Sequence, residues 1–265
     1  MSVPAGTAAR TVRMTVLHPD RLNLYADRGN VLVIAERCRR RGIRLEVTAI
    51  RIGDPIGDIV ADLIYIGGGQ DREQAVCADD LRARRPALVD AIAAGATLLG
   101  ICGGYQLLGH EYATGNGTLT GLGLLDVSTS RSDDHRLVGN VVVDVDTALP
   151  VLRGGDVPPT LVGFENHQGR TTLGSGVRPL GTVRVGAGNN GHDATEGAYN
   201  GTVIGTYLHG PLFAKNVWFA DALIERAVGA ALAPLPDGFE HAVHVRALSI
   251  AQEHVAQIAR GGAHR

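Results

Sequence analysis

The sequence predicts an α/β fold with a mostly parallel central sheet and helices on both faces. Short apolar runs alternate with stretches of helical periodicity through the first half of the chain. Several of these runs end in glycine, and none approaches the ~18 residues of a membrane span. Strands that alternate with helices form βαβ units, and helices then cover both faces of the parallel sheet.

The first half of the chain contains the clearest elements. Strands are expected at residues 13–17, 45–50, 63–66 and 97–101, and helices at residues 31–41, 85–94 and 105–112. Asp27 opens a short stretch with the chemistry of a helix start. Gly42 and Gly95 follow two of the expected helices, where glycine favours helix termination.

The second half is rich in Gly, Asn and Thr after Gly115, so turns are expected between short strands. Strands are expected at residues 141–145, 161–164 and 203–207, and a helix at residues 216–228. Residues 233–239 have the Pro and Gly density of a linker, and residues 241–260 have helical spacing. We expect a flexible extension (1–12), one domain (13–232), and a linker with a C-terminal helix packed on the domain (233–265). A partner-binding helix is the alternative for the last element.

Composition excludes several classes of function. The formal net charge of the 265 residues is −2, so no global basic field attracts nucleic acid. The cysteines, Cys38, Cys77 and Cys102, form no CxxC pair, which argues against a disulfide framework or a zinc site. Lys215 is the only lysine, so the chain has no GxxxxGK[ST] phosphate loop. We expect a cytoplasmic protein without a signal peptide, a membrane insertion or a bound metal.

Cys102 is the candidate nucleophile. It lies in the sequence GICGG directly after the expected strand 97–101, which is a GxCxG form of the nucleophile elbow. Its flanking glycines allow a sharp turn from strand to helix, and the helix N-terminus favours thiolate over thiol. The N–H of Gly103 is then a candidate oxyanion donor. A buried, inert cysteine is the alternative, and we assign that structural role to Cys38 and Cys77.

A second oxyanion donor is expected from Gly68 or Gly69, in the glycine turn 67–69. This turn ends a neighbouring strand, and ligands of open parallel sheets bind at the carboxyl ends of the strands. On these residues alone, a flexible turn without function is the simpler interpretation.

A base must activate the thiol, and the chain has ten histidines. Seven lie in polar or terminal settings and are expected at the surface: His18, His110, His192, His241, His244, His254 and His264. Three remain: His135, His167 and His209. His209 follows the expected strand 203–207, as Cys102 follows its own strand, and His167 is its rival. Periodicity does not decide between them.

Five short stretches, in this order, resemble class I glutamine amidotransferases of the cobyric-acid-synthase-like branch, and within it the GatD-type subunits of lipid II isoglutaminyl synthases. They are LNLY (22–25), GGGQDREQ (67–74), ICGGYQLLG (101–109), GFENH (163–167) and GTYLHGP (205–211). The resemblance covers nearly the whole chain after Arg13. It implies that Cys102 is the nucleophile, His209 the base and Arg136 the glutamine-binding arginine. A guanidinium suits the α-carboxylate of glutamine, although the residues alone make Arg136 a solvated loop charge.

The sequence departs from the usual triad at His209. Ordinary members carry His-Pro-Glu, whereas Gly210 and Pro211 follow His209 here and offer no acid. Without a carboxylate, the orientation of the imidazole is poorly fixed. Our hypothesis is that a partner supplies this carboxylate, so that activity is weak until the complex forms.

The implied function is that of a glutaminase subunit. The resemblance implies a heterodimer with a MurT-like subunit of the Mur ligase family, which binds ATP and Mg, while this chain carries no cofactor. The ammonia would amidate the D-glutamate of lipid II to D-isoglutamine, near the inner face of the membrane. The alternatives are an ammonia donor for another carboxylate, such as a corrinoid, a cysteine hydrolase that leaves glutamine untouched, and a non-enzymatic subunit with a dead site.

Overall fold

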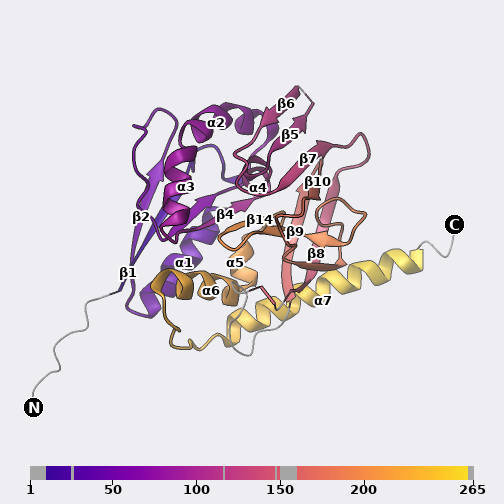
Figure 1. The fold of residues 1–265 in the computed structure, drawn as a ribbon. Helices are drawn as coiled ribbons and strands as arrows, with labels where there is room; N and C mark the ends of the chain where they lie inside the picture. The colour runs from indigo at the N-terminus through magenta and orange to yellow at the C-terminus, as the bar shows by residue number, and fades with distance from the viewer. Residues whose placement is uncertain (1–9, 25–26, 116, 147, 150–159, 262–265) are drawn as a thin grey trace, which may run out of the picture.

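A six-stranded sheet forms the centre of the computed structural model, which describes residues 10–24, 27–115, 117–146, 148–149 and 160–261 (Figure 1). Its strands lie in the order β13-β14-β4-β3-β1-β2, and all neighbours are parallel except β13 and β14. Their bounds are β1 (Thr11–Leu17), β2 (Arg44–Ile50), β3 (Leu63–Ile66), β4 (Thr97–Ile101), β13 (Ala198–Tyr199) and β14 (Val203–Thr206). Every residue of β3, β4 and β14 is buried, which explains their continuous apolar runs.

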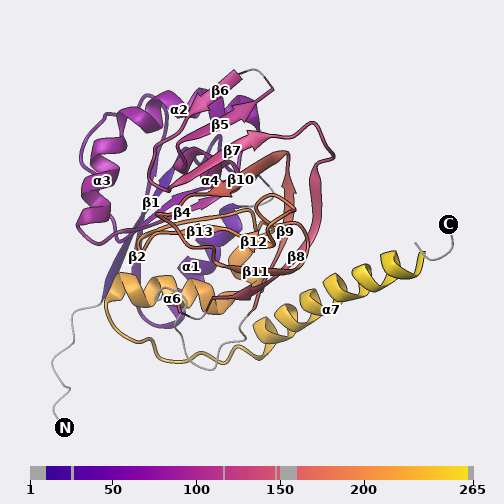
Figure 2. The same cartoon turned by 45° about the vertical axis from the view of Figure 1, so that its right-hand side comes forward.

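Helices cover both faces of this sheet, which confirms the predicted fold class (Figure 2). On one face, α1 (Arg28–Arg40), α5 (Leu212–Lys215) and α6 (Val217–Val228) contact one another. The opposite group comprises α2 (Asp71–Ala83), α3 (Arg85–Ala93) and α4 (Gly103–Leu108).

The end of α4 differs from the prediction. The helix expected to reach residue 112 ends at Leu108, because Gly109 is extended and the His110 N–H donates to the Val127 carbonyl. The chain then enters a strand, β5 (Glu111–Thr114), instead of continuing as a helix.

Two further four-stranded sheets occupy much of the second half of the chain. One has the order β10-β7-β5-β6 and the other the order β12-β11-β8-β9. Their remaining bounds are β6 (Gly117–Thr120), β7 (Val127–Arg131), β8 (Leu137–Val145), β9 (Thr160–His167), β10 (Gly169–Leu173), β11 (Gly181–Val185) and β12 (Thr195–Glu196). An antiparallel bridge between Phe164 of β9 and His209 joins the last sheet to the turn that follows β14.

The last helix, α7 (Gly238–Gly261), packs on β8, β9, β11 and α5, and its C-terminal part extends away from the body (Figure 2). Its His244 is buried, and both ring nitrogens have partners: Nε2 lies 2.9 Å from Oγ1 of Thr160, and Nδ1 donates to the Lys215 carbonyl. His18 is also buried, with Nε2 3.1 Å from Asp80. The expected surface positions of both histidines were therefore wrong. Among the described residues, no helix is long and apolar enough to cross a membrane.

Candidate active site

Cys102 occupies the sharp turn between β4 and α4 and has a positive φ of 48°. A non-glycine residue rarely adopts this conformation, which is typical of a functional turn. The neighbouring glycines permit the close packing of the turn. A Cβ on Gly100 would lie 2.6 Å from Cδ1 of Leu108, and a Cβ on Gly104 would lie 2.5 Å from the Ile66 carbonyl oxygen. The local sequence thus forms the elbow that its glycines predicted.

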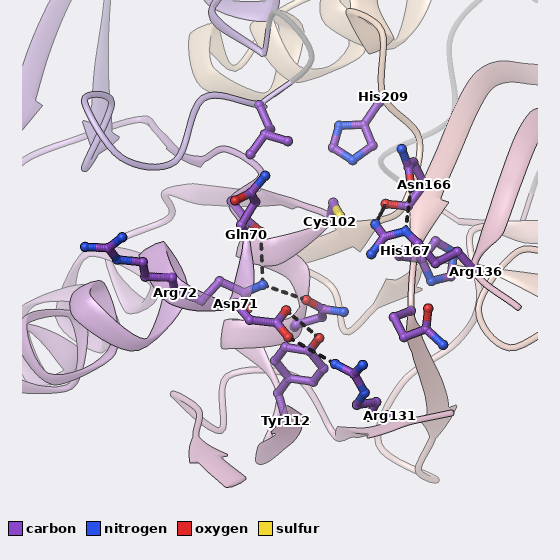
Figure 3. A pocket seen from close by; sticks show the side chains of 15 residues that line it. Gln70, Asp71, Arg72, Cys102, Tyr112, Arg131, Arg136, Asn166, His167 and His209 are labelled. Atoms are coloured by element: carbon purple, nitrogen blue, oxygen red, sulfur yellow. Dashed lines mark hydrogen bonds and ion pairs between the residues drawn. The ribbon is translucent and has the colours of Figure 1, made fainter. Parts of the chain in front are cut away.

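The elbow opens into a polar cavity of about 630 Å³ (Figure 3). Cys102 lines this cavity together with His209, His167 and Arg136. The other two cysteines lie in the apolar core, where burial raises the pKa of Cys38 to about 11 and of Cys77 to about 12. Both are therefore thiols at neutral pH.

His209 is the candidate base in the cavity that Cys102 lines. Its side chain is fully buried and lines the same cavity. Burial lowers the pKa of His209, but the charge on Cys102 and hydrogen bonds with Asp27 and Cys102 raise it to about 10. His209 therefore carries a proton, and with it a positive charge, at neutral pH.

His167 also lines the cavity but has different partners. Its ring stacks on Tyr207 with centroids 3.5 Å apart, and its Nδ1–H donates to the Gly169 carbonyl at 2.8 Å. Burial lowers the pKa of His167, so the ring is neutral. The two rivals therefore differ in their surroundings: His167 is held by Tyr207 and Gly169, whereas the charge on Cys102 acts on His209.

An acid within this chain faces His209. Oδ1 of Asp27 lies 3.4 Å from Nδ1 of His209, and both side chains are fully buried. No acid follows His209 in the sequence, but the start of α1 brings a carboxylate of this chain to its ring. The hypothesis of a partner-supplied carboxylate thereby loses its premise.

Asp27 is available because another residue caps α1. Asp27 occupies the N-cap position, yet its side chain makes no cap hydrogen bond. The Arg28 N–H instead donates to Oδ1 of Asn23 at 2.7 Å. Sequence reasoning had assigned Asp27 to the helix start, which is the commonest role of Asp at such a position. Its position two residues after the resembling stretch LNLY was the available signal that it has another role.

Gly68 lies at the centre of the site. Its N–H donates to Oδ2 of Asp27 at 2.5 Å, and its carbonyl accepts from the Leu24 N–H at 3.0 Å. A Cβ on Gly68 would lie 2.8 Å from Cε1 of His209 and 3.5 Å from Cβ of Cys102. Since its N–H supports Asp27, Gly68 is not positioned as the oxyanion donor that we expected. Gly69 and Gly103 remain the candidates.

Arg136 reaches the cavity from the residue before β8. Its Nε donates to Oδ1 of Asn166 at 3.0 Å, and Nη2 donates to the Asn166 carbonyl at 3.1 Å. The pairing of β8 with β9 places Leu137 opposite His167, which brings Arg136 beside the cavity (Figure 3). Its position suits a carboxylate ligand, and its role stays a prediction.

A chain of buried hydrogen bonds forms the floor of the cavity. Nε2 of Gln74 donates to Oε1 of Gln106, and Nε2 of Gln106 donates to the Tyr207 hydroxyl. The hydroxyl groups of Tyr207 and Thr171 are 2.6 Å apart, and that of Thr129 follows at 2.8 Å. Such a network holds side chains in single orientations. Within the described part of the chain, no group of three or more His, Cys, Asp or Glu side chains is arranged to hold a metal ion.

Comparison with known proteins identifies the family. Residues 13–217 match the model of the CobB/CobQ-like glutamine amidotransferase domain. The chain belongs to this family. As a CobB/CobQ-like amidotransferase, it uses glutamine as nitrogen donor, and the earlier resemblance is confirmed at the level of family and fold.

Lipid II isoglutaminyl synthase subunits and cobyric acid synthases are among the relatives of this amidotransferase. The lipid II isoglutaminyl synthase (glutamine-hydrolyzing) subunit GatD of Staphylococcus aureus (strain N315) is 42% identical over 217 residues, which cover 81% of this chain and 84% of the relative. GatD of Streptococcus pneumoniae (strain ATCC BAA-255 / R6) is 34% identical, with 80% and 78% covered. Cobyric acid synthase of Citrobacter koseri is 35% identical, but the match covers only 36% of that protein.

A solved structure supports the amidotransferase fold. The structure of PurLQS from Thermotoga maritima superposes with a TM-score of 0.56 at 15% identity, over 82% of this chain and 98% of the other. At this identity the likeness concerns the fold alone.

Proposed function

We propose that this chain is the glutaminase subunit of a lipid II isoglutaminyl synthase. Its ammonia would pass to a MurT-like ATP-dependent ligase in a heterodimer, which amidates the D-glutamate of lipid II to D-isoglutamine for peptidoglycan synthesis. The observation that carries this proposal is the match to two GatD subunits over about four-fifths of both chains. Cobyric acid synthases are longer proteins, of which the match spans little more than a third. A cytoplasmic complex near the inner face of the membrane follows from this acceptor.

The first half-reaction is acyl transfer to Cys102. The thiolate attacks the side-chain carbonyl carbon of glutamine and forms a C–S bond. The oxyanion accepts hydrogen bonds from the N–H groups of Gly103 and Gly69. His209 then donates its proton to the amide nitrogen, the C–N bond breaks, and ammonia leaves behind a glutamyl thioester.

The second half-reaction hydrolyses the thioester. Neutral His209 removes a proton from water, and the hydroxide oxygen attacks the thioester carbon. Collapse of the intermediate breaks the C–S bond, releases glutamate and restores the thiolate. Asp27 orients the imidazole through Nδ1 in both steps and stabilises its charged form, as the acid of a triad does.

Arg136 binds the substrate α-carboxylate in this proposal. Two of its nitrogens are already fixed by Asn166, so the guanidinium plane is oriented before the substrate arrives. A fixed bidentate donor gives geometric selectivity as well as charge.

Reconstitution tests the proposed acceptor. The full chain, the MurT-like partner, lipid II, ATP, Mg²⁺ and amide-¹⁵N-glutamine are mixed, and ¹⁵N incorporation into the stem peptide is measured by mass spectrometry. We expect amidation with the wild type and none with Cys102→Ala. Ammonium chloride should restore amidation by the variant complex, because the ligase site is intact. If glutamine is hydrolysed but lipid II carries no ¹⁵N, this acceptor is rejected and another carboxylate is favoured. If glutamine is not hydrolysed at all, a cysteine hydrolase with another substrate is favoured.

A further inference from the structure

Gln74 occupies a buried position beside the reaction centre that the mechanism above does not use. It lies on α2, is only 2% exposed, and lines the same cavity as Cys102. A Cβ on Gly103 would lie 3.1 Å from Cδ of Gln74. The amide of Gln74 is therefore packed against the elbow itself.

The orientation of this amide is fixed by its two donors. Nε2 donates to the Gly69 carbonyl at 3.1 Å and to Oε1 of Gln106 at 3.0 Å. A primary amide has two N–H groups, so both are used. Gln106 is itself held through Tyr207, so the pair does not reverse without breaking the buried chain.

The remaining atom of this amide is an unsatisfied acceptor. Oε1 of Gln74 is buried and has no hydrogen-bond partner among the described residues. A buried polar atom without a partner is costly, so Oε1 of Gln74 is a candidate acceptor for a donor of the bound substrate.

L-Glutamine carries two groups that can donate to this oxygen. The side-chain NH₂ leaves as ammonia after protonation by His209, so it must face the imidazole. The α-ammonium, with three N–H donors, is the group that remains for Gln74. We propose that Oε1 of Gln74 accepts a hydrogen bond from the α-ammonium of bound L-glutamine and makes the site selective for substrates that carry this group. The proposal rests on glutamine hydrolysis at Cys102 and is independent of the ammonia acceptor.

Asp71 is the rival acceptor in the cavity, but other groups already engage it. Oδ1 of Asp71 accepts from the Tyr112 hydroxyl at 2.8 Å, and Oδ2 lies 3.8 Å from Arg131 (Figure 3). Gln74 therefore fits the ammonium better than the carboxylate does.

The test compares L-glutamine with glutaramate, which has the same carboxamide and carboxylate but no α-ammonium. For the wild type, we expect kcat/KM to be about 10- to 100-fold higher with L-glutamine, the range of one charge-assisted hydrogen bond. Gln74→Met keeps the length of the side chain and removes the acceptor. It should lower kcat/KM for L-glutamine by a similar factor, mainly through KM, and change glutaramate hydrolysis little. Gln252→Met, at an exposed position of α7, is the matched control.

Other outcomes overturn the proposal. An equal loss with both substrates would make Gln74 a structural support of the Gly69 turn, and equal use of both substrates by the wild type would mean that the ammonium is not recognised. Loss of discrimination in Asp71→Asn but not in Gln74→Met would assign the ammonium to Asp71. If the Gln74→Met variant hydrolyses neither substrate, calorimetry can measure the affinity for L-glutamine of Cys102→Ala and of Cys102→Ala/Gln74→Met. Equal affinities of these two variants would reject the proposal. A wild type that hydrolyses neither substrate would remove the glutaminase assignment itself.

Discussion

The carboxylate of Asp27 lies 3.4 Å from Nδ1 of His209, although 182 positions separate the two residues in the sequence. The second oxygen of the same carboxylate accepts the N–H of Gly68. One buried acid thus contacts both the candidate base and the glycine turn beside the nucleophile. A candidate nucleophile, base and acid of a triad therefore all belong to this chain.

Asp27→Asn should abolish most of the glutaminase activity. An amide in place of the carboxylate does not stabilise the imidazolium and favours the wrong tautomer, which costs about 10⁴-fold in kcat in the best-studied triad. We expect a loss of about 10³- to 10⁴-fold in glutamate formation, with the fold retained by circular dichroism. Asp58→Asn, on an exposed loop, is the matched control. Near-normal activity of Asp27→Asn, alone or with the partner, would show that the acid comes from elsewhere.

Gly68→Ala should disable the site through a single methyl group. The added Cβ would lie 2.8 Å from Cε1 of His209 and 3.0 Å from Oδ2 of Asp27, closer than such contacts allow. We expect at least a 100-fold loss of kcat, because displacement of a catalytic group by about 1 Å costs this much. Gly57→Ala provides the comparison, since nothing lies within 4 Å of its Cβ position. Equal activities of the two variants would place the imidazole elsewhere in the working enzyme.

Arg136→Ala should weaken glutamine binding more than it slows the chemistry. A bidentate guanidinium–carboxylate contact is lost, which predicts an increase in KM of about 100-fold and a much smaller change in kcat. Initial rates over a range of glutamine concentrations give both constants. The control is Arg39→Ala, whose guanidinium pairs with Glu36 on the exposed face of α1. A fall in kcat at unchanged KM would contradict a role in binding.

The stability that His209 contributes should depend on pH. Its pKa is raised from 6.5 to about 10, despite the opposing effect of burial, by the charge on Cys102 and by hydrogen bonds with Asp27 and Cys102. Because the pKa of His209 is raised in the folded state, proton binding to its imidazole contributes to the free energy of unfolding. This contribution is complete below about pH 6.5 and disappears as the pH rises towards 10. The free energy of unfolding in urea should therefore differ most between wild type and His209→Gln near pH 6, and least near pH 10. A difference that is constant with pH would show that His209 does not hold its proton in the folded protein, and His110→Gln serves as an exposed control.

The strands of the central sheet could be predicted because strands buried on both faces consist of continuous runs of apolar residues. The strands Leu63–Ile66 and Thr97–Ile101 have the predicted bounds, since both faces are covered and every side chain is apolar or small. The strand Gly117–Thr120 could not be predicted in this way, because most of its residues are exposed and it has no continuous apolar run. The end of α4 was missed for another reason, since a contact of His110 with the distant Val127 decides it.

The site was predictable where its chemistry is local. The glycines around Cys102 indicated the elbow. The end of a strand made His209 one of two candidate bases, and the family resemblance favoured it over His167. Asp27 was missed because a local interpretation, the start of a helix, already explained it, and only the fold brings it to His209. Gln74 was missed although it ends the resembling stretch 67–74, because the resemblance assigned it no role and its unsatisfied oxygen is a property of the packed structure.

The side chain of Asn23 affects the orientation of the Asp27 carboxylate. Because its side chain satisfies the Arg28 N–H, the carboxylate of Asp27 can point away from the helix that it begins. Removal of the Asn23 amide would make the start of α1 and the imidazole compete for one acid. A substitution of Asn23 would then alter both the stability of α1 and the turnover rate, although Asn23 contacts neither the substrate nor the sulfur. Substitutions in the short loop before α1 can therefore change the activity of this enzyme while its reacting groups stay the same.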